Sequence, residues 1–219
     1  MKENVIKYYV LCNRLKNIIR KGWFDWNINR DRIESVAEHV YGTLMLAIAI
    51  YYEYDYNIDL NKVIMMLSIH ELEETIISDL TEWDVDSNKK RENGHLATHN
   101  ILNNIISANE LEELISEFDN KSSKEAIFAY HVDKLECDIQ CKLYYEENNK
   151  CVDMNNQSNN KSFYDERVQK LLKECKDFAT MWLEFDKDKF KDDNNFVEIL
   201  EYIENNSIKW WFVLHIITH

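Results

Sequence analysis

Proline is absent from this chain of 219 residues, and glycine occurs only three times. Proline ends helices, glycine weakens them, and both residues build the tight turns that join β-strands. A sequence with so few of either therefore favours long helices and disfavours a strand-rich fold. Apolar residues also recur at helical spacing along most of the chain. We predict an all-α fold.

The spacing of apolar residues also predicts where the helices lie. The segment 35–54 opens with a capping-box pair, Ser35 and Glu38, and is apolar on almost every side, which predicts a central position. A second capping pair, Ser122 and Glu125, begins the segment 122–146. The full set of expected helices covers about 3–20, 35–54, 61–77, 93–107, 122–146, 164–185 and 195–211, with polar breaks at about 84–92, 119–123 and 148–161.

The length of the chain is enough for one domain with a substantial core and does not require two. We predict a single domain over residues 1–219 without internal repeats. The residues suited to chemistry all fall within about 14–146. The low-complexity stretch at about 148–161 predicts a surface loop, and helices over 164–217 complete the fold.

Charge and cysteine content restrict the class of protein. A net charge of −14 argues against binding to nucleic acid polymers or anionic membranes. The apolar C-terminal run 210–217 is far shorter than the roughly 20 residues that a membrane-spanning helix needs. The five cysteines are odd in number and form no CxxC pair, which is typical of reduced thiols. We predict a cytoplasmic protein.

Two histidines and two acids are the candidate metal ligands: His39, His70, Glu71 and Asp133. Each lies in a segment predicted to be an apolar helix, where polar groups must be satisfied and a cation satisfies several at once. Two imidazoles and two carboxylates leave open positions on a divalent ion, as a catalytic site requires. For any one of these residues alone, an unrelated core histidine or surface acid is the simpler interpretation.

Positive charge is concentrated near the N-terminus. Residues 14–32 contain six basic and two acidic side chains, in a chain whose net charge is −14. A phosphate bound next to acidic metal ligands needs such a patch, and arginine offers two parallel donors for it. The alternative is a solvated segment whose basic residues pair with acids elsewhere.

The order of these motifs resembles the HD-domain metal-dependent phosphohydrolases, and the flanking residues resemble the bacterial 5'-deoxynucleotidase branch. The resemblance covers about the first two-thirds of the chain and rests on Arg20-Lys21-Gly22-Trp23, Glu34-Ser35-Val36-Ala37-Glu38-His39, His70-Glu71-Leu72-Glu73-Glu74, Ser78-Asp79-Leu80 and Asp133-Lys134-Leu135-Glu136. It implies an HD-type helical bundle and one divalent ion (Mn²⁺, Co²⁺, Zn²⁺ or Fe²⁺) on the four candidate ligands. The chain departs from the family at Glu71, where the family has Asp.

The resemblance also implies roles around the metal. Arg20 matches the family's phosphate-contacting arginine, and Trp23 and Asp79 match residues at the sugar. We place Glu74 on the same helical face as His70, where it activates water or protonates the leaving oxygen. The family commonly forms homodimers, and the aromatic run Trp210–Phe212 offers apolar surface for a partner or, equally, for the core.

The leading hypothesis is hydrolysis of a nucleoside 5'-monophosphate, in particular a deoxyribonucleoside 5'-monophosphate, to nucleoside and phosphate. An HD-family nucleotide pyrophosphohydrolase, triphosphohydrolase or cyclic-nucleotide diesterase is an alternative, because pocket walls are not motifs. The departure at Glu71 motivates a third hypothesis, a non-catalytic metal-bound ligand sensor. His95 and His99 are four residues apart and could bind a second metal ion, although an exposed pair needs no ligand role.

Overall fold

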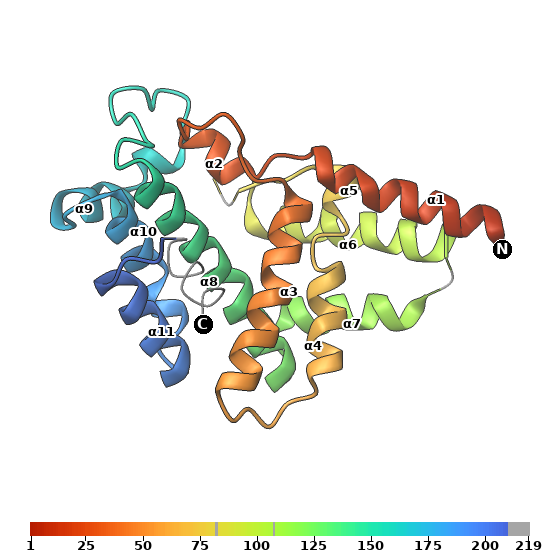
Figure 1. The fold of residues 1–219 in the computed structure, drawn as a ribbon. Helices are drawn as coiled ribbons and strands as arrows, with labels where there is room; N and C mark the ends of the chain where they lie inside the picture. The colour runs from red at the N-terminus through yellow and green to blue at the C-terminus, as the bar shows by residue number, and fades with distance from the viewer. Residues whose placement is uncertain (82, 107, 210–219) are drawn as a thin grey trace, which may run out of the picture. The chain divides into compact units, whose positions relative to one another are not determined.

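The computed structural model describes residues 1–81, 83–106 and 108–209, and it confirms the all-α prediction. No β-strand occurs in these residues, where an isolated bridge joins Ile19 to Ser35. The α-helices (Figure 1) are α1 (Lys2–Cys12), α2 (Lys21–Asp25), α3 (Val36–Glu53), α4 (Leu60–Ile69), α5 (Glu74–Ile77), α6 (Ser87–Asn104), α7 (Asn109–Asn120), α8 (Lys124–Glu147), α9 (Glu166–Glu174), α10 (Phe178–Asp186) and α11 (Asn194–Asn205). Short 3₁₀ helices are η1 (Asn13–Asn17), η2 (Ser162–Tyr164) and η3 (Lys187–Lys189).

Side-chain caps set the starts of several helices. The predicted capping box of Ser35 and Glu38 opens α3. The carboxylates of Asp59, Asp86 and Asp165 accept backbone N–H bonds at the starts of α4, α6 and α9. These bonds satisfy N–H groups that have no partner within the helix. Helices α1, α5 and α7 begin without such a side-chain cap.

The predicted capping pair at α8 is shifted in the structure. Ser123, rather than Ser122, accepts the N–H of Ala126 at 3.1 Å. The carboxylate of Glu125 accepts the N–H of Asp59 at 3.1 Å and so serves a tertiary contact in place of a cap. The helix begins at Lys124 because the neighbouring serine captures the first turn.

The chain divides into two compact units. Unit 1 consists of Met1–Phe24 and Arg32–Asp133, and unit 2 consists of Asp25–Asp31 and the chain from Lys134 onward. All residues predicted to form the site belong to unit 1. The prediction of one domain over residues 1–219 is not tested by this division and stays a prediction.

Unit 1 is a set of packed helices (Figure 1). Helix α3 packs against α4, α4 packs against α7, and α7 packs against α6. An apolar cluster between these helices consists of Ile69, Leu72, Ile101, Leu102 and Ile115. Tyr8 and Leu11 of α1 cover this cluster. The turn between Ile69 and Leu72, which carries His70 and Glu71, is therefore anchored in an apolar core.

Helix α3 is buried on one face only. Its buried residues are Val36, His39, Thr43, Ala47 and Ile50. The opposite face exposes Tyr41, Met45, Ile48 and Tyr52. The apolar residues of this segment, from which a central position was predicted, thus divide into a buried stripe on the side of α4 and an exposed stripe.

The predicted helix over 61–77 is interrupted. Helix α4 ends at Ile69, a turn follows, and α5 begins at Glu74. In this turn the N–H of Leu72 bonds to the carbonyl of Ile69, so the bonds connect residues three apart. Adjacent residues of a regular helix point about 100° apart and do not face one another. The turn removes that constraint on His70 and Glu71, which the sequence had placed inside a helix.

Gly94 of α6 lies against this turn. A Cβ atom at position 94 would stand 3.3 Å from Cγ of Glu73, a tight contact. Helix α6 packs against α5, so the absence of a side chain at position 94 permits a close approach.

Other boundaries differ from the sequence prediction. The expected helix 3–20 becomes α1 followed by η1, and the expected helix 164–185 divides into α9 and α10 at residues 175–177. Helix α6 starts at Ser87, inside a predicted break, and α7 was not predicted. Helix α7 was missed because its first turn is acidic, its apolar stripe is narrow, and only four residues separate it from α6. The expected helix 195–211 is observed as α11 up to Asn205, and its last two residues lie outside the described residues, as does the Trp210–Phe212 run.

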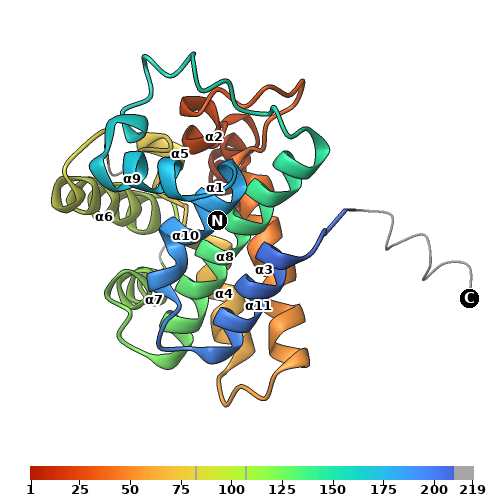
Figure 2. The same ribbon diagram turned by 90° about the vertical axis from the view of Figure 1, so that its left-hand side faces the viewer.

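In unit 2, α10 packs against α9 and α11 (Figure 2). The irregular segment 148–161 is mostly exposed, as expected of a surface loop, but Cys151, Gln157 and Asn160 are buried. The Nε2 group of Gln157 donates to the carbonyl of Trp26 at 3.1 Å. Two of the amide side chains that suggested a solvated loop therefore anchor it instead.

Two further features bear on the class of protein. All five cysteines are free thiols. None of the described helices combines the length and the apolar character that a membrane span demands.

Candidate metal centre and phosphate site

The four predicted metal ligands come together in unit 1. His39 comes from α3, His70 and Glu71 from the turn after α4, and Asp133 from α8. One ligand atom from each lies within 4.8 Å of the others. Nε2 of His39 is 3.0 Å from Oδ1 of Asp133 and 3.7 Å from Oε1 of Glu71. The order of motifs in the sequence thus corresponds to one cluster in space.

Hydrogen bonding fixes the orientation of His70. Its Nδ1 donates to the carbonyl of Leu67 at 2.7 Å, which leaves Nε2 with the lone pair. That Nε2 atom is buried without a hydrogen-bond partner and stands 3.7 Å from carboxylate oxygens of both Glu71 and Asp133. The ring also lies 5.4 Å, between centroids, from Phe118 of α7.

A buried nitrogen lone pair beside two carboxylates is costly unless a positive charge satisfies it. A divalent ion held by His39, His70, Glu71 and Asp133 meets that need. Two nitrogen and two oxygen donors suit Mn²⁺, Fe²⁺, Co²⁺ or Zn²⁺. The residues present therefore fit the metal that the sequence predicts.

The acids of the turn have opposite protonation tendencies. Burial opposes the ionisation of Glu71, but the electrostatic influence of His70, Arg20 and His39 outweighs it and lowers the pKa of this carboxyl to about 2. Burial and the negative charge of Glu71 raise the pKa of Glu73 to about 8. Glu71 is thus ionised and suited to ligation, whereas Glu73 retains a proton near neutral pH.

Glu74 lies beside the metal-ligand cluster. This residue is 1% exposed, and its Oε2 atom is buried without a hydrogen-bond partner. Burial, and then the charges of Glu71 and Asp79, raise the pKa of Glu74 well above its usual range. The group of four ligand atoms does not include it. The argument from a shared helical face is wrong, because α4 ends at Ile69, but the turn keeps Glu74 close to Glu71.

Arg20 is the cation at this cluster. Its guanidinium is 3.0 Å from Oε1 of Glu71 and 3.8 Å from Oδ2 of Asp79. The same Asp79 oxygen accepts the backbone N–H of Lys21 at 2.7 Å. Ser78, with a φ of 64°, precedes Asp79 and turns the chain after α5. The predicted phosphate and sugar residues Arg20 and Asp79 are therefore neighbours.

Trp23 is more completely buried than contact with a sugar requires. It is 2% exposed, and its indole Nε1–H donates to Oε2 of Glu34 at 2.8 Å. Its role at the sugar stays a prediction. Glu34 belongs to one of the sequence motifs, but the sequence assigned it no role. The structure shows that it is the acceptor that the buried indole N–H of Trp23 requires. Phe118 was missed because it lies on the unpredicted α7.

The other basic residues of the segment 14–32 include several ordinary ion pairs. Arg30 pairs with Glu147 at 3.0 Å, and Arg32 pairs with Glu38. Lys21 lies 3.6 Å from Asp84. Arg20 is the member of this segment that reaches the metal-ligand cluster within the described part of the chain.

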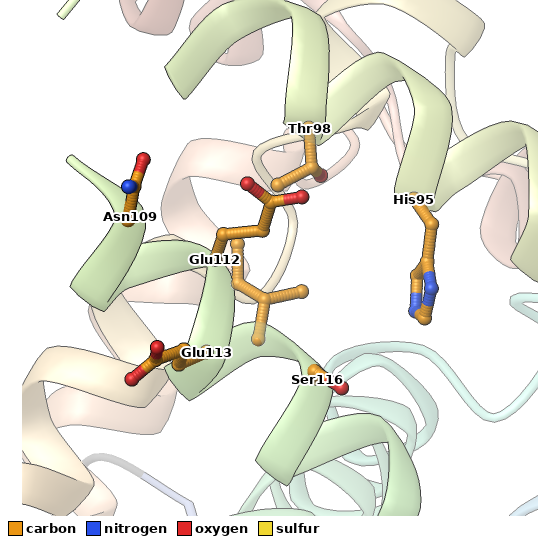
Figure 3. A pocket seen from close by; sticks show the side chains of 7 residues that line it. His95, Thr98, Asn109, Glu112, Glu113 and Ser116 are labelled. Atoms are coloured by element: carbon orange, nitrogen blue, oxygen red, sulfur yellow. The ribbon is translucent and has the colours of Figure 1, made fainter. Parts of the chain in front are cut away.

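His95 and His99 of α6 face α7. His95 is 2.5 Å from Oδ2 of Asp119, and His99 is 2.9 Å from Oε1 of Glu112. Between the two helices lies a pocket of about 390 Å³ (Figure 3), lined by His95, Thr98, Asn109, Glu112, Glu113, Ile115 and Ser116. Among the described residues, neither histidine belongs to a group of three ligand atoms close enough to hold an ion. The second-metal possibility gains no support.

An all-α unit that gathers two imidazoles and two carboxylates beside an arginine is the kind of site that metal-dependent hydrolases use. Residues 12–173 match the HD domain family, and this chain belongs to that family.

Several relatives are named as enzymes. The protein is 26% identical over 154 residues to "5'-deoxynucleotidase HDDC2" of Bos taurus, covering 68% of this chain and 71% of the relative. It is 25% identical over 172 residues to the protein of the same name from Dictyostelium discoideum, covering 74% and 87%. The predicted resemblance to 5'-deoxynucleotidases and the prediction of an enzyme are confirmed by these matches.

Solved structures share the fold. A conserved hypothetical protein from Pyrococcus furiosus superposes with a TM-score of 0.61 at 24% identity, over 92% of this chain and 99% of that one. A predicted metal-dependent phosphohydrolase from Magnetospirillum magnetotacticum gives a TM-score of 0.54 at 22% identity, over 64% and 70%. The helical arrangement is therefore one that crystal structures already contain.

Proposed function

We propose that the protein hydrolyses nucleoside 5'-monophosphates, in particular deoxyribonucleoside 5'-monophosphates, to nucleoside and phosphate. The observation that carries the proposal is the guanidinium of Arg20, 3.0 Å from the carboxylate of Glu71 within a cluster of buried metal ligands. A cation next to a metal site is suited to a phosphate that the metal also contacts. The names of the relatives support the same substrate class.

His39, His70, Glu71 and Asp133 would hold one divalent ion. When bound, such an ion lowers the pKa of a water molecule and polarises the phosphoryl group. Arg20 then neutralises phosphate charge with its two parallel donors. Because Arg20 already contacts Glu71 and Asp79, its guanidinium is held in place before substrate arrives.

Glu74 handles the proton in this proposal. It is buried beside Glu71 and outside the group of four ligand atoms, so it is free to exchange a proton with water or with the leaving 5' oxygen. Asp79 is the candidate contact to the sugar, since its carboxylate lies next to Arg20. Trp23 is retained as a second sugar residue on the strength of the resemblance.

Phosphate release from a panel of nucleotides tests the proposal. The panel contains deoxyribo- and ribonucleoside monophosphates, triphosphates and cyclic nucleotides, each with Mn²⁺, Co²⁺, Zn²⁺, Fe²⁺ or a chelator. Metal-dependent release of inorganic phosphate from monophosphates supports it. Exclusive release of pyrophosphate or triphosphate, or opening of cyclic nucleotides, would favour the related HD activities. Metal and nucleotide binding without turnover would identify a sensor.

We also propose a cytoplasmic location and no binding to nucleic acid polymers. The five free thiols and the net charge of −14 support these proposals.

A further inference from the structure

The pocket of about 390 Å³ between α6 and α7 takes no part in the proposed reaction (Figure 3). Its lining residues all belong to unit 1, and they include neither the metal ligands nor the residues of the phosphate site. Among the described residues that line it, Glu112 and Glu113 are acidic and none is lysine or arginine. One wall is formed by Ile115, which is 4% exposed and belongs to the apolar cluster of unit 1. The pocket therefore combines negative charge with an apolar wall.

Thr98 of α6 brings a buried hydroxyl to this pocket. The residue is 2% exposed, and its Oγ1 atom has no hydrogen-bond partner within the described chain. A threonine on a helix can bond its hydroxyl to the carbonyl of the preceding turn, but Thr98 does not. A buried hydroxyl without a partner costs free energy. A molecule in the pocket that bonds to this oxygen would remove that cost.

Glu112 of α7 lies on the other side of the pocket, and its side chain is held in place. Its Oε1 atom is 2.9 Å from Nδ1 of His99, and its Oε2 atom accepts a hydrogen bond from Nδ2 of Asn103 at 3.1 Å. The bond to His99 is the main cause that lowers the pKa of Glu112, so this carboxyl is ionised near neutral pH. Figure 3 shows its carboxylate directed toward Thr98. A carboxylate has about four lone pairs, so Glu112 can still accept further bonds.

We propose that this pocket binds a small aliphatic cation that carries primary ammonium groups. An ammonium group has three N–H donors and no acceptor. The carboxylate of Glu112 and the hydroxyl of Thr98 accept two of these donors. The carbon chain lies against Ile115, and a second ammonium group is attracted to Glu113, which is exposed at the rim.

Other classes of ligand suit the pocket less well. A metal ion needs several donor atoms close together, and in the part of the chain that the structure describes the pocket residues form no group of three such atoms. An anion would face two carboxylates and meet no lysine or arginine on the described lining. A neutral molecule would bond to Thr98 but would gain nothing from the charge. An ammonium group satisfies both the hydroxyl and the charge.

The acids of α7 have a second possible role, because negative charge in the first turn stabilises the start of a helix. Glu110 and Glu112 both belong to this first turn. The helix dipole would therefore account for either acid, but it does not account for the buried hydroxyl of Thr98 on the facing helix. Glu110 does not line the pocket, so the two acids can be compared directly.

Equilibrium dialysis of the full chain against three probes tests the class of ligand. The probes are 1,4-diaminobutane, 4-amino-1-butanol and 1,4-butanediol, which have similar length and carry two, one and no ammonium groups. Measurement near physiological salt suppresses attraction to the net charge of the chain. The diamine should bind at one site, the amino alcohol more weakly, and the diol not at all. Absence of diamine binding, or equal binding of the diol, would overturn the proposal.

Three variants test whether the diamine binds in this pocket. Thr98→Val replaces the hydroxyl by a methyl group of similar shape, so it should leave the melting temperature no lower while raising the dissociation constant by about 10-fold or more. Glu112→Gln should weaken binding by a similar factor. Glu110→Gln removes the same charge from the same turn outside the pocket and should leave the dissociation constant unchanged.

The comparison of the two glutamates is decisive if Thr98→Val loses its helical circular dichroism. Equal weakening by Glu110→Gln and Glu112→Gln would show general attraction to the acidic helix and overturn the proposal. Binding that is unaffected by Thr98→Val and Glu112→Gln would place the diamine elsewhere and overturn it as well.

Discussion

The two units bury polar groups in different ways. In unit 2, Asn160 donates to Gln157 at 2.8 Å, Gln157 donates to the carbonyl of Trp26, and Ser162 donates to Asn160 at 2.6 Å. This network is neutral and supplies its own partners. In unit 1, the buried cluster is charged, and Nε2 of His70 has no hydrogen-bond partner. A complete network stabilises a fold, whereas an incomplete one requires a ligand.

Asp138 of unit 2 is an exception, because it is a buried polar group without hydrogen-bond partners. It is fully buried, and neither carboxylate oxygen has a hydrogen-bond partner. Burial, and then the charge of Asp186, raise its pKa well above the usual range. The surroundings of Asp138 in unit 2 therefore favour the protonated form of a buried acid, whereas those of Glu71 in unit 1 favour the ionised form.

The largest effect should follow from His70→Ala. We expect loss of bound metal and of activity together, with a lower melting temperature, because unpaired carboxylates at Glu71 and Asp133 remain and repel each other. Elemental analysis alongside phosphate release measures both. Asn160→Ala is the matched change in unit 2 and should lower stability while leaving metal content intact. Equal metal loss in both variants would contradict the claim that the metal site lies in unit 1 alone.

Glu74→Ala should separate chemistry from metal binding. The variant should keep its metal and fold but turn over about 10²–10⁴-fold more slowly, the usual effect of losing one acid–base group. Turnover at saturating substrate is the measurement. A rate within a few-fold of the wild type would remove Glu74 from the proposed mechanism.

Arg20→Ala should act mainly on phosphate binding. Loss of a charged hydrogen-bonding partner costs about 1.5–3 kcal/mol, so we expect KM to rise about 10–100-fold while metal content stays unchanged. Arg30→Ala removes an exposed arginine that pairs with Glu147 in unit 2 and is the control. Similar kinetics for the two variants would contradict the assignment of the phosphate site.

Asp138→Asn should remove the pH dependence of stability that the buried acid of unit 2 causes. Because the folded-state pKa of Asp138 is raised, the native protein binds more protons than the unfolded chain above the ordinary aspartate pKa. The free energy of unfolding therefore falls as pH rises through that interval. The variant should remove this fall and be more stable than the wild type at neutral pH, as measured by denaturation at several pH values. An unchanged pH profile would contradict a raised pKa of Asp138.

The sequence predicted the cluster in unit 1 because its motifs carry the ligands themselves. His39 and Asp133 are far apart in the chain, yet each falls in a segment that the sequence predicted to be a helix. The break after Ile69 was missed, because tertiary contacts and bonds between residues three apart override a continuous apolar pattern there. The packed loop around Gln157 was missed for a related reason. Amides are equally suited to solvent and to buried backbone partners, and composition does not distinguish the two.

The exposed apolar residues of α3 show a third limit of sequence analysis. A helix that is apolar on every side predicts full burial but does not say whether the same chain or another chain covers it. Only the structure separates the covered face, with His39, from the uncovered face, with Tyr52.

The central claim is that Glu71, and not Glu74, is the metal ligand of the turn. Metal content measured in Glu71→Ala beside Glu74→Ala tests it most directly. The account predicts that Glu71→Ala loses the ion and that Glu74→Ala retains it, because Glu71 supplies one of the four ligand atoms within 4.8 Å of one another. Retention of metal in Glu71→Ala with its loss in Glu74→Ala would contradict the account and make Glu74 the ligand.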